Sequence, residues 1–398
     1  MSPPVSSFHL IMTCVLIPFL LLLVHFPLTS PQLLKGCGFS ALYNFGDSLS
    51  DTGNALVQFD FGGNGKYPYG MTIGKPTGRF SDGLLLIDRI AESAGLPHCN
   101  PYLRKDMDHS KGVNFAVAGV SVLSKAQRDK FGLHLIYSQS SLDVQLQWFV
   151  NFSREAFHNE SARKANFESA LFVLGGGGND YGGFKNTPEE KMTLIPYVIA
   201  ALKEGLKTVI SHGARRIVVM GVYQGGCLPG FNKTILERDQ GPIVCDKEWN
   251  SYLDLHNKHV QKLVLELGKE YPQVHLAYGN MWDGIQWMFD NFRSLGLHIS
   301  YARCCGTEEH KVCGETGTPF CKDPYHYIWW DNLHFTDRAY KLIASKVIPW
   351  MYRDLQCATY NFTSFRSGGV RVVDSIHQHL WFSFAVMMVI FLFLFYEI

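Results

Sequence analysis

The chain has 398 residues, of which 46% are hydrophobic, and its formal net charge at pH 7 is +1. A chain of this length and composition can bury a large core, and a charge near zero provides no electrostatic basis for binding nucleic acid. No C-x-x-C, H-E-x-x-H or P-loop motif occurs, so the sequence indicates no cofactor and no metal.

The first segment of the chain is typical of a secretory signal. Residues 10–24 form an apolar run interrupted by Pro18, and a stretch rich in Pro, Ser and Thr follows. We therefore predict a signal peptide over residues 1–30; a buried helix is the alternative, but the run has no amphipathic pattern. N-glycosylation sequons agree with passage through the secretory pathway. They begin at Asn151, Asn159, Asn232 and Asn361.

The first predicted strand, residues 41–45, is followed directly by Gly46-Asp47-Ser48-Leu49. A turn of small residues at this position can expose a serine at the C-terminal edge of an open α/β sheet, where such proteins carry their chemistry. Ser48 is inert as a nucleophile unless a base takes its proton. The alternative is that Asp47 and Ser48 form an ordinary turn or helix cap.

Two glycine-containing blocks follow further along the chain. The first is Asn114 to Gly119, and the second is Gly175 to Tyr181, which follows a predicted strand at residues 170–174. An acyl-transfer site needs hydrogen-bond donors aimed at the oxyanion that forms during attack. The backbone N–H of Gly119 and the carboxamide of Asn179 are candidates, because glycine permits a close approach of the backbone. In the alternative, Gly119 is a tight turn and the glycine run is a flexible loop.

The middle of the chain alternates between strand-like and helix-like segments. Residues 216–220 and 274–278 are predicted strands, and a helical spacing of mostly apolar side chains lies between them. This stripe consists of Trp249, Leu253, His256, Val260, Leu263 and Leu267. His256 is interpreted as part of the stripe and not as a ligand. The alternation predicts one three-layer α/β/α domain with a parallel central sheet, as in flavodoxin.

The chain has ten cysteines, which favours an oxidising compartment. If Cys14 leaves with the signal, nine remain, so at least one thiol stays free or pairs unexpectedly. We predict a disulfide between Cys227 and Cys245, which flank a loop. Four more cysteines are expected to form disulfides within a long insert, because their spacing does not fit a zinc site. The pairing among these four is left open. These are Cys304, Cys305, Cys313 and Cys321.

Asp331 and His334 form a candidate pair near the end of the predicted domain. An Asp three residues before a His can hold the imidazole in one tautomer, so that its other nitrogen faces Ser48. The alternative is that Asp331 caps the helix predicted to begin near Thr336.

The last residues of the chain are apolar. Residues 380–396 form an apolar run, and residues 359–379 form a linker that contains Ser367-Gly368-Gly369. Small residues, a spacer and an apolar tail occur in this order in a GPI-anchor signal. A transmembrane anchor is the alternative, although the run is at the short limit for a membrane span. A third interpretation is an incidental extension.

The blocks around Ser48, Gly119, Asn179 and His334, in this order, resemble the plant branch of the GDSL esterase/lipase family of the SGNH hydrolase superfamily, in the acetylajmalan esterase-like subgroup. Secondary matches are residues 75–83 and Cys304-Cys305-Gly306. The resemblance extends over about residues 37–355, so we predict a hydrolase domain over residues 37–358. Phe335 departs from the pattern, since many relatives have Pro after the His; this should alter the stiffness of the loop more than its chemistry.

The resemblance implies a flavodoxin-like α/β/α hydrolase fold with Ser48 as nucleophile, His334 as base and Asp331 as the group that orients it. It also implies an oxyanion hole made by the Ser48 N–H, the Gly119 N–H and the Asn179 side chain.

The sequence therefore predicts a secreted or cell-surface serine carboxylic-ester hydrolase that acts through an acyl-enzyme. Its expected substrates are small-molecule, polysaccharide or lipid esters, with no nucleic-acid partner and with a candidate membrane attachment in the C-terminal tail. No lid-like amphipathic helix is evident, which favours a small acyl group over bulk triglyceride. The alternatives are a non-catalytic wall-binding or recognition glycoprotein on an esterase fold, and a serine peptidase, which the resemblance does not support.

Overall fold

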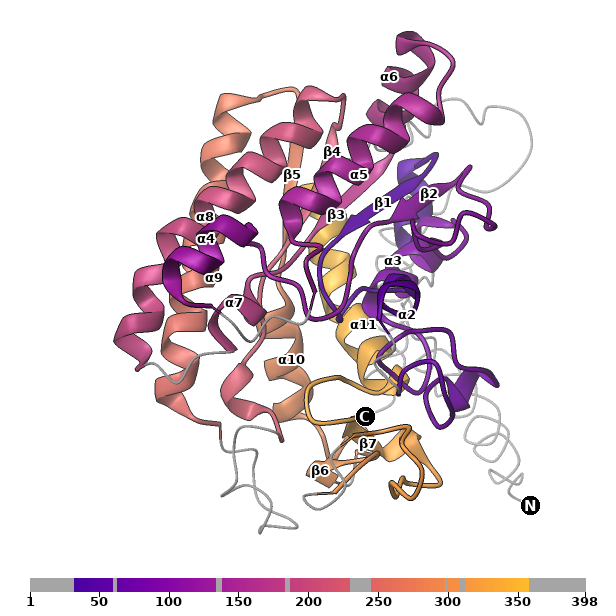
Figure 1. Ribbon diagram of the computed structural model, residues 1–398, viewed down its shortest axis with the longest axis vertical. Helices are drawn as coiled ribbons and strands as arrows, with labels where there is room; N and C mark the ends of the chain where they lie inside the picture. The colour runs from indigo at the N-terminus through magenta and orange to yellow at the C-terminus, as the bar shows by residue number, and fades with distance from the viewer. Residues whose placement is uncertain are drawn as a thin grey trace, which may run out of the picture. The chain divides into compact units, whose positions relative to one another are not determined.

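The computed structural model describes residues 32–59, 63–133, 138–182, 187–229, 245–297, 299–307 and 312–357 (Figure 1). These residues belong to one compact unit that ends at Cys357. The predicted signal peptide, the linker at 359–379, the apolar tail at 380–396 and the sequons at Asn232 and Asn361 lie outside the described residues. Within the described part, no helix combines the length and the apolar character needed to cross a membrane.

A parallel five-stranded sheet forms the centre of the unit, with strand order β2-β1-β3-β4-β5. The strands are β1 (Leu42–Phe45), β2 (Gly112–Asn114), β3 (Leu171–Leu174), β4 (Arg216–Met220) and β5 (His275–Gly279). This order is that of flavodoxin-like folds, so the predicted fold class is confirmed. The four strands predicted from the sequence agree with β1, β3, β4 and β5 to within one residue.

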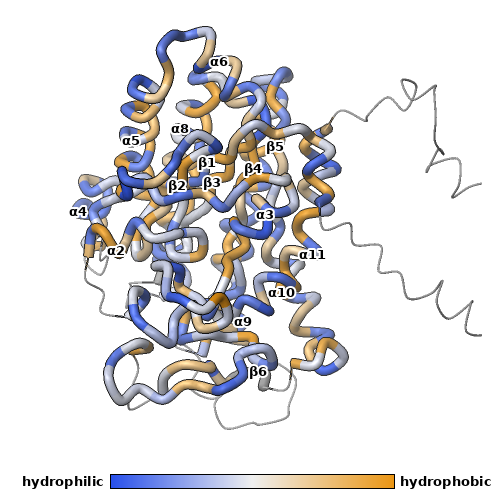
Figure 2. Tube along the Cα trace, turned by 90° about the vertical axis from the view of Figure 1, so that its right-hand side faces the viewer, coloured by the Kyte–Doolittle hydropathy of each residue, from blue (hydrophilic) through white to orange (hydrophobic). Residues whose placement is uncertain are grey.

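Helices cover both faces of the sheet (Figures 1 and 2). One face packs against η1 (Leu33–Cys37), α3 (Leu86–Ala94), α10 (Met281–Asp290) and α11 (Asp337–Asp354). The other face packs against α5 (Leu142–Glu155), α6 (Glu160–Ser169), α8 (Pro188–Ser211) and α9 (Lys247–Glu270). Alternate residues of each strand contribute to the two cores, as the period of two requires. For example, Val173 belongs to the first core and Phe172 to the second.

Shorter elements lie in the connections. They are α2 (Asn54–Gln58), η2 (Met71–Ile73), α4 (Lys125–Phe131), α7 (Gly178–Gly182), η3 (Gly225–Cys227), η5 (Pro324–His326) and a second sheet of β6 (Ile299–Arg303) and β7 (Tyr327–Trp329). The glycine run, for which a flexible loop is the alternative interpretation, continues into the one-turn helix α7.

The long helices begin at capping residues that the sequence supplies. Asp246 accepts a hydrogen bond from the Trp249 N–H at the start of α9, and the predicted stripe of this helix is buried apart from the half-buried Trp249. The hydroxyl of Thr336 accepts from the Ala339 N–H at the start of α11. The alternative in which Asp331 caps α11 is therefore wrong.

Four disulfides cross-link the described residues. They join Cys37 to Cys357, Cys227 to Cys245, Cys304 to Cys321 and Cys305 to Cys313. Among the described cysteines, Cys99 alone is a free thiol; it is buried and donates to the carbonyl of Leu42. The pairing of Cys37 with Cys357, which links the two ends of the unit, was not among the sequence predictions.

Candidate active site

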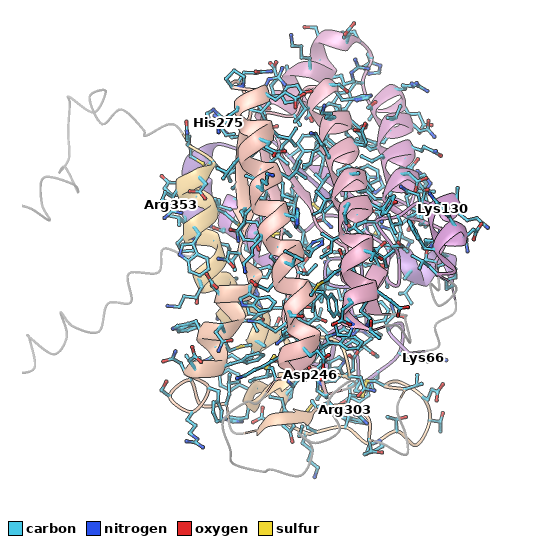
Figure 3. All side chains as sticks on the ribbon, turned by 90° about the vertical axis from the view of Figure 1, so that its left-hand side faces the viewer. Lys66, Lys130, Asp246, His275, Arg303 and Arg353 are labelled. Carbon is cyan, nitrogen blue, oxygen red and sulfur yellow. A yellow bond between two sulfur atoms is a disulfide. The ribbon has the colours of Figure 1, made fainter. Side chains whose placement is uncertain are left out.

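The loops that follow the strands meet at one end of the unit. Figure 3 shows His275, the first residue of β5, at the opposite end from Asp246 and Arg303. Because the strands are parallel, all their carboxyl ends point towards the end that carries Asp246 and Arg303. Ser48, Gly119 and Asn179 follow β1, β2 and β3 respectively, so three neighbouring strands deliver them to the same edge.

Ser48, His334 and Asp331 form a continuous chain of hydrogen bonds. The Nε2 atom of His334 lies 2.8 Å from the Ser48 hydroxyl oxygen. The Nδ1 atom of His334 lies 2.8 Å from both carboxylate oxygens of Asp331. His334 and Asp331 are 6% and 7% exposed, whereas Ser48 is partly exposed. A base that contacts both a serine and an orienting carboxylate is the arrangement required for an activated nucleophile.

Several donors hold the Asp331 carboxylate in place. The backbone N–H groups of Leu333 and His334 donate to its Oδ1 atom at 2.8 and 2.9 Å, and the Tyr69 hydroxyl donates to its Oδ2 atom at 2.9 Å. Burial alone would raise the pKa of Asp331, but His334 and these donors lower it below its ordinary value. Asp331 is therefore held as a carboxylate that can stabilise an imidazolium on His334.

Packing and backbone contacts orient the His334 ring. The ring of Phe80 lies against it, with the two ring centroids 4.9 Å apart. The Trp330 N–H donates to the His334 carbonyl at 2.8 Å, which closes the short loop that carries the Asp–His pair. Phe80 comes from the segment at residues 75–83, which the sequence marks only as a secondary match.

The turn that carries Ser48 is braced on both sides. The side chain of Gln145, on α5, accepts from the Gly46 N–H at 3.0 Å and donates to the Gly46 carbonyl at 2.9 Å. The Asp47 carboxylate accepts from the Leu49 N–H, so this hydrogen bond joins the two residues that flank Ser48. The Asp51 carboxylate accepts from the backbone N–H groups of Gly53, Asn54, Ala55 and Ala118. These bonds tie the Ser48 turn to the loop that contains Gly119.

The candidate oxyanion donors lie in two loops that are joined to each other. Gly119 has a φ of +69°, which favours glycine at this position. The Asn179 side chain donates to the Val120 carbonyl at 2.8 Å, which uses one of its two amide N–H groups. The carboxylate of Asp180 accepts from the Ser121 hydroxyl and from the N–H groups of Val122 and Leu123. Asp180 therefore fixes the Gly119 loop against α7.

His256 packs beneath the glycine run. Its Nδ1 atom lies 2.9 Å from the Tyr181 hydroxyl, and it is fully buried. Burial lowers the pKa of His256 to about 3, so the ring is neutral at neutral pH. A Cβ atom at Gly177 would lie 2.8 Å from the His256 ring, so a side chain there would displace one of the two groups. The interpretation of His256 as a core residue therefore agrees with its position.

The candidate residues line one cavity. Ser48, Gly119, Asn179 and His334 all contribute to its wall, and its volume is about 650 Å³. This volume is within the range of pockets that bind small molecules. In the described part of the chain, no three His, Cys, Asp or Glu side chains converge as a metal site would require.

Several supporting residues were not predicted from the sequence. Tyr69 and Gln145 lie outside the motif blocks and carry no local signal, whereas Asp180 lies inside the glycine block that contains Asn179. Of the predicted glycosylation sites in the described residues, Asn151 lies on α5 and Asn159 caps α6, and both are exposed.

Comparisons with known proteins identify the family of the chain. The profile of the family GDSL-like Lipase/Acylhydrolase matches residues 42–347. Acetylajmalan esterase 2 of Rauvolfia serpentina is 33% identical over 342 residues, which cover 82% of this chain and 94% of that protein. Acetylajmalan esterase of the same plant is 32% identical over 352 residues, which cover 84% of this chain and 91% of that protein.

A third relative is a GDSL esterase/lipase of Arabidopsis thaliana. It is 33% identical over 349 residues, which cover 81% of this chain and 93% of that protein. With a family match over most of the described unit and relatives aligned over most of their length, the chain belongs to the GDSL-like lipase/acylhydrolase family and is a carboxylic ester hydrolase.

Proposed function

We propose that this hydrolase works through a Ser48–His334–Asp331 triad and an acyl-enzyme on Ser48. The observation that carries the proposal is the chain of 2.8 Å contacts from the Ser48 hydroxyl through His334 to Asp331. In the first step the Ser48 oxygen attacks the ester carbonyl carbon, and His334 Nε2 takes the hydroxyl proton. Asp331 stabilises the imidazolium that results and keeps the ring in one orientation.

The tetrahedral intermediate places a negative charge on the former carbonyl oxygen. The proposed oxyanion hole consists of the Ser48 N–H, the Gly119 N–H and the amide N–H of Asn179 that does not bond to Val120. Gln145, Asp51 and Asp180 bind neighbouring residues in the loops that carry Ser48 and Gly119, which supports a site that is arranged before substrate arrives. Donors that need no reorganisation during the reaction are the most effective stabilisers of such a charge.

Breakdown of the intermediate releases the alcohol, which takes the proton from His334 Nε2, and leaves the acyl group on Ser48. A water molecule then gives a proton to His334 and attacks the acyl carbonyl. As the second intermediate collapses, His334 returns this proton to the Ser48 oxygen, the bond between Ser48 and the acyl carbon breaks, and a carboxylic acid is released. The overall reaction consumes one ester and one water and needs no cofactor.

The proposed location of the enzyme is extracytoplasmic, in the secretory pathway and at the cell surface or wall. Four disulfides in the described residues and exposed sequon asparagines at 151 and 159 support this location. Treatment with an N-glycosidase tests this location, because removal of N-linked glycans should increase the electrophoretic mobility of the protein. In an Asn151→Gln/Asn159→Gln variant the mobility shift should be smaller, with only the contribution of the two other sequons left. The C-terminal tail stays a prediction: release by phosphatidylinositol-specific phospholipase supports a GPI anchor, and retention with the 380–396 peptide detectable supports a span.

The decisive experiment compares Ser48→Ala with Ser50→Ala, a serine in the same turn. Each protein is tested for labelling by a fluorophosphonate and for hydrolysis of acetyl, hydroxycinnamoyl and long-chain esters. We expect wild type and Ser50→Ala to be labelled and active, and a folded Ser48→Ala protein to be neither. Hydrolysis that survives in Ser48→Ala contradicts the nucleophile assignment. A folded wild type without labelling and without hydrolysis of any ester favours the non-catalytic alternative.

A further inference from the structure

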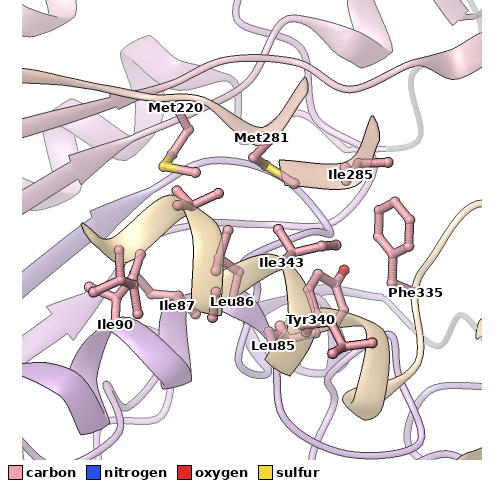
Figure 4. Close-up of a cluster of buried hydrophobic side chains, with 14 of the residues drawn as sticks. Leu85, Leu86, Ile87, Ile90, Met220, Met281, Ile285, Phe335, Tyr340 and Ile343 are labelled. Carbon is pink, nitrogen blue, oxygen red and sulfur yellow. The ribbon is translucent and has the colours of Figure 1, made fainter. Parts of the chain in front are cut away.

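The cavity at the active site is lined by residues from both faces of the sheet, with Val222, Tyr252 and Leu253 on the α9 side and a second apolar part on the α3 side. Besides the candidate catalytic residues, its wall includes Val173 on β3 and Met220 on β4, together with Leu86, Ile87 and Ile90 on α3 and Met281 on α10. All six belong to the core on the α3, α10 and α11 side of the sheet. We call this part of the cavity the acyl arm, and Figure 4 shows five of its side chains within that buried cluster.

A residue without a side chain helps to keep the arm connected to Ser48. Gly175 follows β3 and lines the cavity two residues after Val173. A Cβ atom at Gly175 would lie 3.1 Å from the Met220 Cβ, which is a tighter contact than most side chains tolerate. Glycine at this position therefore leaves room between the active-site edge and the buried face of the sheet.

Two parts of the cavity wall differ in their access to solvent. In the acyl arm, Ile90 is 1% exposed and Ile87 and Val173 are each 3% exposed. Val312 and Leu333, which also line the cavity, are 45% and 41% exposed. The arm therefore lies inside the core, while the part of the wall formed by Val312 and Leu333 opens to water.

This asymmetry matches the two halves of an ester. In the proposed mechanism the alcohol must leave and water must enter while the acyl group stays bound to Ser48. An open side suits the leaving alcohol, and a closed apolar arm suits the group that stays. We propose that the acyl arm binds an unbranched apolar acyl chain of several methylene groups, so that the enzyme prefers esters of medium-chain acids to acetate esters. This inference rests on the proposed function and differs from the small acyl group favoured by the sequence.

The length of that chain is limited by the closed wall of the arm, to which one polar residue also contributes. Asn44 lies on β1 beside Val173 in the sheet register, is fully buried and lines the cavity. Its side-chain nitrogen donates to the Ser50 carbonyl and to the side-chain oxygen of Asn114, but its own side-chain oxygen, Oδ1, has no hydrogen-bond partner. This oxygen is already shielded from water, and the buried side chains around the arm leave no room for a chain longer than the arm. We therefore expect an optimum chain length and not a continuous increase.

The test measures kcat/KM for 4-nitrophenyl esters from acetate to hexadecanoate. In wild type, kcat/KM should rise by roughly fourfold for each added methylene up to the optimum and then fall, because each buried methylene contributes a similar transfer free energy. Ile90→Phe should move the optimum to shorter acids, and Ile90→Ala should move it to longer acids. Ile285→Ala is the matched control, since Ile285 is buried in the same core but does not line the cavity.

Acetate esters of different alcohols form a second series. Ile90→Phe should change the relative rates within this series much less than those within the acyl series, because the alcohol lies towards the open end. If Ile90→Phe fails to fold, the rates at which fluorophosphonates of increasing alkyl length label wild-type Ser48 should show the same optimum. A wild type that is fastest on acetate, or Ile90 variants with the wild-type chain-length profile, overturns the inference while the proposed function stands. A folded wild type that hydrolyses no ester overturns the proposed function itself.

Discussion

The hydroxyl of Tyr69 donates a 2.9 Å hydrogen bond to Oδ2 of Asp331, which lies 262 positions later in the chain. Tyr69 is 5% exposed, and its ring packs edge-on against Phe80 and Trp330. The same cluster contains Cys304, Cys305 and Cys313. The disulfide-linked insert and the Asp–His pair are therefore parts of one packed unit. Within this cluster, Tyr69 contacts the Asp331 carboxylate directly.

Tyr69→Phe should lower kcat by roughly 10- to 100-fold, the range expected for loss of a hydrogen bond to a charged group. The KM should change little, because Tyr69 contacts Asp331 and does not line the cavity. The acid limb of the pH profile of kcat/KM should move to higher pH, since loss of the donor destabilises the ionised carboxylate. Tyr67→Phe, at an exposed position nearby, is the control. If both variants have the same kcat and pH profile, Tyr69 is only a packing residue.

Asn179→Ala should lower kcat by on the order of 10²–10³ with a smaller change in KM, because the oxyanion exists only in the transition state and intermediate. The variant also loses the bond to Val120, which could loosen the loop. Ser121→Ala loosens the same loop, because it removes a bond to Asp180, but leaves the amide in place. It should cost much less activity than Asn179→Ala. An increase in KM at constant kcat would instead make Asn179 a substrate-binding residue.

The buried pair of Arg79 and Asp88 makes stability depend on pH. Two Arg79 nitrogens donate to the two Asp88 oxygens at 2.8 and 2.6 Å. Burial alone would raise the pKa of Asp88, but Arg79 lowers it below its ordinary value. A carboxyl whose pKa is lower in the folded state stabilises the fold above its unfolded pKa of about 3.9 and loses that contribution as pH falls further.

Asp88→Asn should therefore destabilise the protein at pH 7 by roughly 3–5 kcal/mol, because Arg79 is left buried without its counter-ion. The difference in Tm between wild type and variant should shrink as pH is lowered from 7 to 3. Thermal unfolding followed by circular dichroism across this range measures it. A difference that is the same at both pH values would exclude the proposed linkage to Asp88.

Removal of the Cys37–Cys357 disulfide should lower stability without lowering activity. This bond spans 320 positions, whereas Cys227–Cys245 spans 18. By the chain-entropy argument the longer closure contributes more, with roughly 2–5 kcal/mol typical for a native disulfide. Cys37→Ser/Cys357→Ser should therefore have a lower Tm than Cys227→Ser/Cys245→Ser at wild-type kcat/KM. The reverse order of Tm would show that native-state packing outweighs loop closure.

Much of the architecture could be predicted from local patterns. β3 and residues 217–220 of β4 are continuous apolar runs, as strands buried on both faces are, and α9 repeats its buried side chains at helical spacing. Ser48, Gly119 and Asn179 each follow a strand, and parallel strands have their carboxyl ends at one edge. β2 was not predicted, because three residues are too few to show a period of two.

The sequence by itself determined four strands of the central sheet, helix α9 and which side chains have the chemistry for acyl transfer, because these depend on spacing along a few turns or residues. Only the tertiary structure decided that Tyr69 donates to Asp331, that Gln145 braces Gly46, and that Cys37 pairs with Cys357. It also decided that the cavity reaches Ile90 beneath the sheet edge. Such contacts join segments that are far apart in the chain, and they depend on how whole helices and loops pack, which no local pattern encodes.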